Sequence, residues 1–154
     1  MSYVSRVLQP SETLVYATKV HWFVYLRMVF WLVVAAIVAI GSNFVPPELQ
    51  TPLLIAAGVI AAIALIYGLD AFIKRATTEL AITDRRVIYK HGLIRRRTFE
   101  MNLSKVESVE VMQSIFGRLF GFGEVEIKGT GASLTPIPRI SDPLAFRSHI
   151  TAAA

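Results

Sequence analysis

The sequence predicts an α+β membrane protein: a two-helix transmembrane hairpin followed by a small antiparallel β domain that ends in a helix. Two apolar runs, residues 22–40 and 53–69, each approach the roughly 20 residues of helix that a bilayer core requires. Hydrophobic residues make up 54% of the chain and charged residues 18%, whereas a soluble domain carries about 25% charged residues. From residue 79 the apolar pattern changes to a period of two, which indicates β-strands.

The first 73 residues predict a cytoplasmic leader and a helical hairpin. The leader covers residues 1–21, and the hairpin covers residues 22–73, with spans at about 22–41 and 53–73. The long polar leader and the second span argue against a cleaved signal peptide. The connection at 41–52 is short, which predicts a tight antiparallel hairpin, and it is rich in turn residues: Gly41, Ser42, Asn43, Pro46, Pro47 and Pro52.

The charges around the hairpin predict its orientation. The connecting loop contains Glu48 and no Lys or Arg. Basic residues flank the other ends of both spans: Arg6, Lys19, Arg27, Lys74, Arg75, Arg85 and Arg86. Because positive residues stay on the cytoplasmic side, we expect a multi-pass protein of the bacterial inner membrane with both termini in the cytoplasm.

Arg27 lies in the first span and Asp70 in the second, and in an antiparallel hairpin their depths coincide. A charge in lipid is costly unless it meets a partner or reaches the headgroups. We therefore expect an intramembrane Arg27–Asp70 pair, or two side chains that reach the headgroups separately, in preference to a proton or ion site. The second span also carries small residues that favour close helix packing: Ala57, Gly58, Ala61 and Ala62.

Residues 76–150 predict a β domain on the cytoplasmic side. The expected strand segments are 79–83, 86–90, 93–101, 108–112, 124–128 and 133–140. Pro136 and Pro138 in the last of these are typical of an edge strand. Asp142 and Pro143 then fit the N-cap and first turn of a C-terminal helix. The order predicts a curved sheet or small barrel with one terminal helix.

Five segments of this domain resemble the bacterial pleckstrin-homology-like (PH-like) family, in its two-span form. They are residues 81–88 (AITDRRVI), 91–94 (HGLI), 103–109 (LSKVESV), 118–123 (RLFGFG) and 140–143 (ISDP). The resemblance covers about residues 74–150. It implies a PH-like split β-barrel capped by the C-terminal helix, and it implies no enzyme activity. The family's ligand is poorly defined, so the resemblance assigns none.

A basic cluster is the first candidate site. Residues 95–97 are three consecutive arginines, and on a strand Arg95 and Arg97 share a face. Lys90 and Arg86 lie on the expected partner strand. We expect these four residues to contact anionic lipid headgroups, at about 1 kcal/mol per basic residue. The alternative is a solvated face whose charge only follows from its cytoplasmic location.

The second candidate is residues 115–122, where Phe116, Phe120 and Phe122 fall within seven positions. Such a segment fits an interfacial loop that dips into lipid, or a patch for a protein partner. The alternative is a short helical turn whose phenylalanines fill the core. We favour the core interpretation because a small domain needs those aromatic side chains.

The sequence gives no sign of catalysis. Cysteine is absent, the three histidines are scattered, and no catalytic, cofactor-binding or metal-binding motif is present, so we expect no cofactor. A nearby bilayer explains the charge of +5 more simply than a nucleic acid does. We expect a non-enzymatic binding or assembly module that contacts anionic lipid or a protein partner, with a homo-oligomer possible. The alternative is an accessory subunit of a membrane transporter or membrane enzyme complex.

Overall fold

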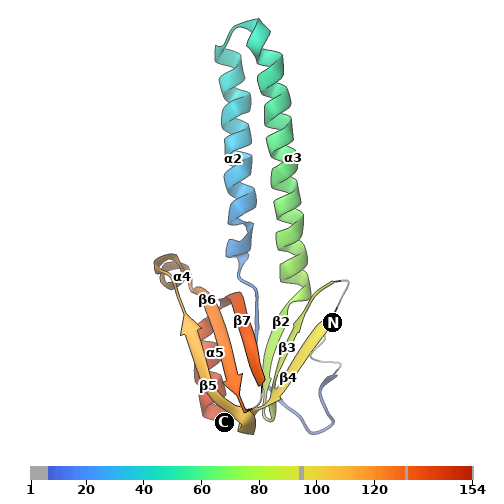
Figure 1. The fold of residues 1–154 in the computed structure, drawn as a ribbon, viewed down its shortest axis with the longest axis vertical. Helices are drawn as coiled ribbons and strands as arrows, with labels where there is room; N and C mark the ends of the chain where they lie inside the picture. The colour runs from blue at the N-terminus through green and yellow to red at the C-terminus, as the bar shows by residue number, and fades with distance from the viewer. Residues whose placement is uncertain (1–6, 94–95, 131, 154) are drawn as a thin grey trace. The chain divides into compact units, whose positions relative to one another are not determined.

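A computed structural model describes residues 7–93, 96–130 and 132–153 (Figure 1). The chain divides into two compact units. One is a helical unit, Trp22–Ile73, and the other is a β domain made from the residues before Trp22 together with those from Lys74 onward. Each unit is described by itself.

The helical unit contains two long apolar helices that pack together. A short 3₁₀ turn (η1, Trp22–Tyr25) leads into α2 (Leu26–Gly41), and a second turn (η2, Ser42–Phe44) leads to α3 (Pro47–Thr77). The second helix therefore begins at residue 47, before the expected start of the second membrane span at about residue 53. Proline fits the first turn of a helix because its missing N–H has no partner there. Pro52 removes one hydrogen bond close to that end and does not terminate the helix.

Small residues at helical spacing form the buried face of α3: Ala57, Ala64, Gly68 and Ala71. Gly68 lies against the Met28 side chain, so that a Cβ atom there would collide with the thioether. The small-residue face predicted from the sequence is only partly correct. Gly58 has open space around its Cα and Ala62 is exposed. Each residue turns a helix by about 100°, which carries Gly58 away from the packed face.

The β domain consists of two antiparallel sheets and a C-terminal helix (Figure 1). The first sheet has the order β1 (Leu14–Lys19), β2 (Glu79–Thr83), β3 (Arg86–His91) and β4 (Arg97–Asn102). The second has the order β5 (Val106–Met112), β6 (Phe122–Gly129) and β7 (Ala132–Ser141). Between them lies η3 (Leu103–Lys105), between β5 and β6 lies α4 (Ile115–Phe120), and α5 (Pro143–Ala153) ends the chain.

Strand β1 corrects the predicted leader. Residues 14–19 were expected to precede the β domain, yet they pair with β2, which follows the helical unit in the sequence, with Lys19 opposite Glu79. At the edge of the second sheet, Val20 forms a bridge with Ile140, and the Thr18 hydroxyl donates to the Ser141 carbonyl at 2.8 Å. The leader strand thus links the two sheets, and the β domain is built from both ends of the chain.

The core lies between the two sheets and α5. It is formed by buried apolar side chains of both sheets, η3 and α5: Leu80, Ile82, Val87, Met101, Leu103, Val125, Ile127, Ile137, Ile140, Phe146 and Ile150. Asp142 precedes α5 with a positive φ of 46°, and its carbonyl accepts a hydrogen bond from the Phe146 N–H at 3.0 Å. Helix α5 therefore begins at Pro143, as predicted, and the residue before it, Asp142, has a left-handed backbone conformation.

Candidate functional site

The two points where the chain leaves and re-enters the β domain lie at one end of the first sheet. His21 is the last domain residue before the helical unit, and Lys74 is the first after it. Lys19 is opposite Glu79, Glu79 is opposite Lys90, and His91 is opposite Arg97. We call this the join end, defined by residues 19–21, 74–79, 90–93, 96–97 and 139–142.

The second sheet reaches the join end through β7 and the start of β6. The His21 N–H donates to the Arg139 carbonyl at 2.7 Å. The His21 ring stacks on Phe122, with ring centroids 5.4 Å apart. Burial lowers the pKa of His21, and the nearby Arg75 charge lowers it further, against an opposing effect of Asp142. The His21 ring therefore packs beside the start of β6, immediately after α4.

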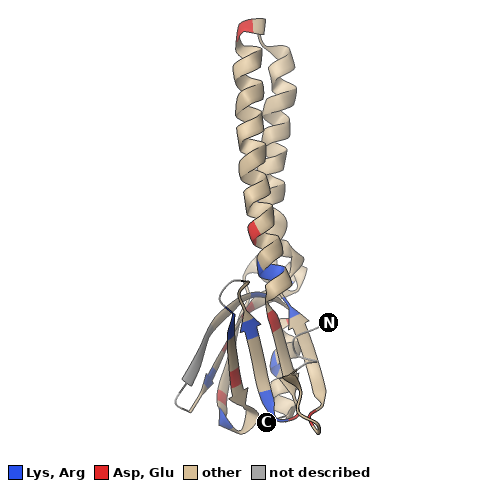
Figure 2. Ribbon diagram, turned by 90° about the vertical axis from the view of Figure 1, so that its right-hand side faces the viewer, with Lys and Arg blue, Asp and Glu red and all other residues tan. Residues whose placement is uncertain are grey.

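Exposed basic residues surround the join end. They are Lys19, Lys74, Arg75, Arg96 and Arg97. Lys90 is half-buried, and Arg95 lies outside the described residues. Figure 2 shows charges of both signs over the β domain, whereas the helical unit is almost entirely uncharged along its length. Of the predicted basic site, Lys90 and Arg97 thus lie at the join end.

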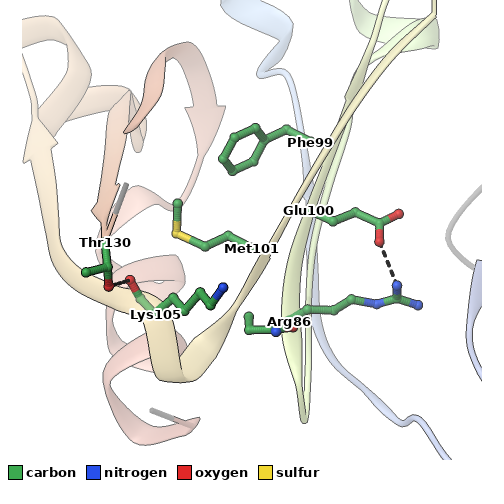
Figure 3. Close-up of a pocket in the computed structure, with 7 residues that line it drawn as sticks. Arg86, Phe99, Glu100, Met101, Lys105 and Thr130 are labelled. Atoms are coloured by element: carbon green, nitrogen blue, oxygen red, sulfur yellow. Dashed lines mark hydrogen bonds and ion pairs between the residues drawn. The ribbon is translucent and has the colours of Figure 1, made fainter. Parts of the chain in front are cut away.

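Arg86, which we grouped with these basic residues from the sequence, lies apart from that basic surface. It lies at the opposite end of β3, and its side chain is only 14% exposed. Its Nη2 lies 2.7 Å from Glu12 Oε2, and its Nη1 lies 2.6 Å from Glu100 Oε2 (Figure 3). Four of the five N–H donors of this guanidinium are engaged, because Nε also donates to Glu12 and Nη2 donates to the Val7 carbonyl as well.

Glu12 is the residue that sequence reasoning missed. Its side chain is 1% exposed and accepts hydrogen bonds from Thr83 Oγ1 at 2.7 Å, Arg86 Nε at 2.8 Å and the Gln9 N–H at 3.0 Å. The hydrogen bond from Arg86 is the main reason why the pKa of this carboxyl falls from 4.5 to about 2, against the opposing effect of burial. The same contact raises the pKa of Arg86.

A cleft of about 390 Å³ lies along the free edge of β4. Figure 3 shows Phe99 and Met101 pointing to one side of the strand and Glu100 to the other, toward Arg86. The rest of the lining comes from Asn102, Lys105 and Thr130. This cleft extends toward the end of the domain opposite the join end. In the parts of the chain that the structure describes, no group of His, Asp or Glu side chains is arranged to hold a metal ion.

The aromatic segment forms α4, which exposes its large side chains. The exposed fractions are 85% for Ile115, 63% for Phe116, 75% for Leu119 and 42% for Phe120. These values contradict the core interpretation of Phe116 and Phe120. Phe122 is different: it is 8% exposed, lies at the start of β6 and stacks against His21, which agrees with the core interpretation of this residue.

The packing of α4 explains which residues point outward. The Ser114 hydroxyl caps the helix by accepting from the Gly117 N–H at 3.0 Å, and Gly121 closes it with a φ of 72°. Gly117 is the buried residue of α4, and its Cα faces the Phe122 carbonyl. Because a glycine forms the contact, the larger side chains of the helix are directed away from the domain.

Arg27 and Asp70 both lie in the helical unit, on α2 and α3 respectively. Their predicted coupling stays a prediction. The interaction of either residue with the headgroups is a prediction of the same kind, because it depends on where the bilayer surface lies.

Comparison with known proteins identifies a family. The Bacterial PH domain family matches residues 15–154, which include β1, the helical unit and the whole of the β domain that follows it. No curated protein and no solved structure matches the chain. The two antiparallel sheets and C-terminal helix are accordingly a PH-like domain, and the match extends through the helices that interrupt it.

Proposed function

This chain belongs to the Bacterial PH domain family, and we propose that it is a non-enzymatic module of the bacterial inner membrane. The helical unit anchors it as a transmembrane hairpin, and the PH-like split barrel holds its join end against the cytoplasmic leaflet. The basic residues of that end bind anionic lipid headgroups. The observation that carries this proposal is that both joins and the exposed basic residues occupy the same end of the domain.

The helices themselves favour a membrane location. Two segments are long and apolar enough to cross a bilayer, namely Trp22–Phe44 and Pro47–Thr77. In the most apolar 18-residue stretch of each segment, only 6% and 11% of the residues, respectively, are buried within the protein. Helices at the core of a soluble protein bury their apolar side chains, whereas these expose large ones such as Phe30, Ile55 and Ile66. A bilayer would cover that surface.

Chain connectivity brings the basic residues near the lipid surface. Lys19 lies three positions before Trp22, and Lys74 and Arg75 directly follow the expected end of the second span. Arg97 lies at the same end of the first sheet, because Lys19 is opposite Glu79, Glu79 is opposite Lys90, and Arg97 is opposite His91. Arg96 directly precedes β4. Each basic residue near an anionic surface contributes about 1 kcal/mol, or roughly five-fold in lipid affinity.

The test is lipid selectivity of the full chain. The protein is reconstituted in phosphatidylcholine vesicles that contain spin-labelled phosphatidylglycerol or spin-labelled phosphatidylcholine. The motionally restricted fraction of each lipid is then measured. We expect a preference for phosphatidylglycerol that weakens as salt increases, because exposed charges are screened beyond about 8–10 Å. Substituting Arg96→Gln and Arg97→Gln together should reduce this preference several-fold.

The matched control removes the same charge elsewhere. Lys105 and Arg147 are exposed and lie outside the join end, so Lys105→Gln with Arg147→Gln should leave the preference unchanged. An equal loss with both pairs would mean that net charge alone, and not the join end, sets lipid selectivity. No preference for phosphatidylglycerol in the unaltered protein would refute headgroup binding.

A further inference from the structure

The apolar side chains of α4 are exposed on the surface of the β domain. Four of its six residues, Ile115, Phe116, Leu119 and Phe120, are large, apolar and 42–85% exposed, and we call them the α4 face. Met112, at the end of the preceding strand, is 48% exposed as well. A contiguous exposed apolar patch on a small domain usually marks a surface that another body covers.

The α4 face is held outward by a well-formed short helix. Ile115 and Leu119 are four residues apart, as are Phe116 and Phe120, so the four side chains share one side of the helix. Gly117 lies on the other side, where the Phe122 carbonyl leaves no room for a Cβ atom. The Ser114 cap and the left-handed Gly121 fix both ends. The orientation of the face is therefore a property of the fold.

The position of α4 identifies what covers it. Phe122 directly follows the Gly121 cap of α4 and stacks on His21. The residue after His21 is Trp22, where the helical unit begins. His21 and Phe122 both belong to the β domain, and His21 is joined directly to the helical unit by the chain. If the hairpin crosses the bilayer, the residue that precedes it lies at the lipid surface, and α4 lies beside that residue. Arg118, the exposed basic residue of α4, suits the same location.

We propose that the α4 face inserts into the cytoplasmic leaflet, at the boundary between headgroups and acyl chains, as a second and monotopic anchor. Apolar faces of this kind reach about 5–10 Å into the interface. The proposal rests on the membrane anchoring proposed above, and it adds an apolar contact to the electrostatic one. Because α4 is too short to bind a bilayer alone, it acts by fixing the orientation of a domain that the hairpin already tethers.

Three single-cysteine variants of this cysteine-free chain test the insertion. Each carries a nitroxide spin label in the full protein, reconstituted in vesicles of phosphatidylethanolamine and phosphatidylglycerol. Leu119→Cys reports on α4 and Ile66→Cys on the helical unit. Leu14→Cys is the aqueous control, because Leu14 is 48% exposed and pairs with Thr83 at the end of the sheet opposite the joins. Relaxation by oxygen, which is enriched in lipid, is compared with relaxation by a polar nickel chelate.

We expect the Leu119 and Ile66 labels to be relaxed mainly by oxygen and the Leu14 label mainly by nickel. Oxygen relaxation at Ile66 with nickel relaxation at Leu119 would overturn the α4 insertion and leave the hairpin anchor standing. Nickel relaxation at Ile66 would overturn the anchor and the insertion together. Spin–spin broadening between Leu119 labels, with little access for either reagent, would overturn lipid insertion in favour of a second copy of the chain.

Discussion

At the residue scale, the buried Glu12 carboxylate shows how a charge is accommodated in a thin core. Its four donors are the Gln9 N–H, the Thr83 hydroxyl and two nitrogens of Arg86. Their combined effect lowers the pKa from 4.5 to about 2. That difference corresponds to about 3 kcal/mol of stability at neutral pH. The Glu12–Arg86 ion pair connects the leader to the turn between β2 and β3. Arg86 also contacts Glu100, which connects the pair to β4.

Replacing Glu12 with Gln should therefore destabilise the β domain by about 3 kcal/mol at pH 7, because Arg86 loses its buried partner. The folded-state pKa lies below the unfolded one, so the stabilisation is complete above pH 4.5 and is lost as the pH falls toward 2. Unfolding by denaturant, followed by circular dichroism at several pH values, measures both effects. The Glu12→Gln variant should lack this part of the pH dependence.

Glu107→Gln serves as the control, because Glu107 is exposed on β5. It should leave stability within about 0.5 kcal/mol of the unaltered protein. If Glu12→Gln kept the same loss of stability between pH 4.5 and pH 2, the carboxyl of Glu12 would not be its source.

At the element scale, the sequence located most strands after the hairpin but missed the one before it. The segment 79–83 coincides with β2, and the segment 133–140 falls within β7. Period and turn residues are local signals, so they predicted these strands well. The pairing of β1 with β2 is not local, and neither is the contact between Glu12 and Arg86, which are 74 residues apart. Local patterns could not predict either contact.

The exposure of α4 was missed for a different reason. Aromatic density in a small domain favours a core assignment, and nothing in the pattern shows which side of a six-residue helix faces inward. The deciding residue is Gly117, whose missing side chain lets the helix approach the Phe122 carbonyl. The glycine inside the expected helical turn was therefore the available signal. Glycine weakens a helix by about 1 kcal/mol relative to alanine, so its presence there suggests a packing requirement.

Gly117→Ala tests that requirement. The added Cβ atom would lie 2.5 Å from the Phe122 carbonyl oxygen, so α4 must move relative to β6. We expect a loss of about 1–3 kcal/mol in the free energy of unfolding, in spite of the better helix propensity of alanine. Gly58→Ala in α3 is the comparison, because nothing lies within 4 Å of its Cβ position, and it should not destabilise the protein. Equal effects at both glycines would contradict the packing role of Gly117.

At the scale of the whole molecule, orientation is the property to measure. The lack of Lys and Arg between the spans predicts that this loop lies outside the cytoplasm. Phe44 is 85% exposed at the turn, and Ser148 is exposed on α5, so each is a suitable site for a single cysteine. An impermeant maleimide added to intact spheroplasts should label Phe44→Cys. It should label Ser148→Cys only after the membrane is disrupted. The reverse pattern would contradict the proposed orientation.

The placement of β1 ahead of the helices has a consequence for biosynthesis. The ribosome makes this strand first, and its partner β2 exists only after both helices have been synthesised. If just one helix inserted, the two strands would end on opposite faces of the membrane, and the sheet could never close. If both helices cross the bilayer as proposed, the second crossing returns β2 to the face that holds β1, and only then can the first sheet close.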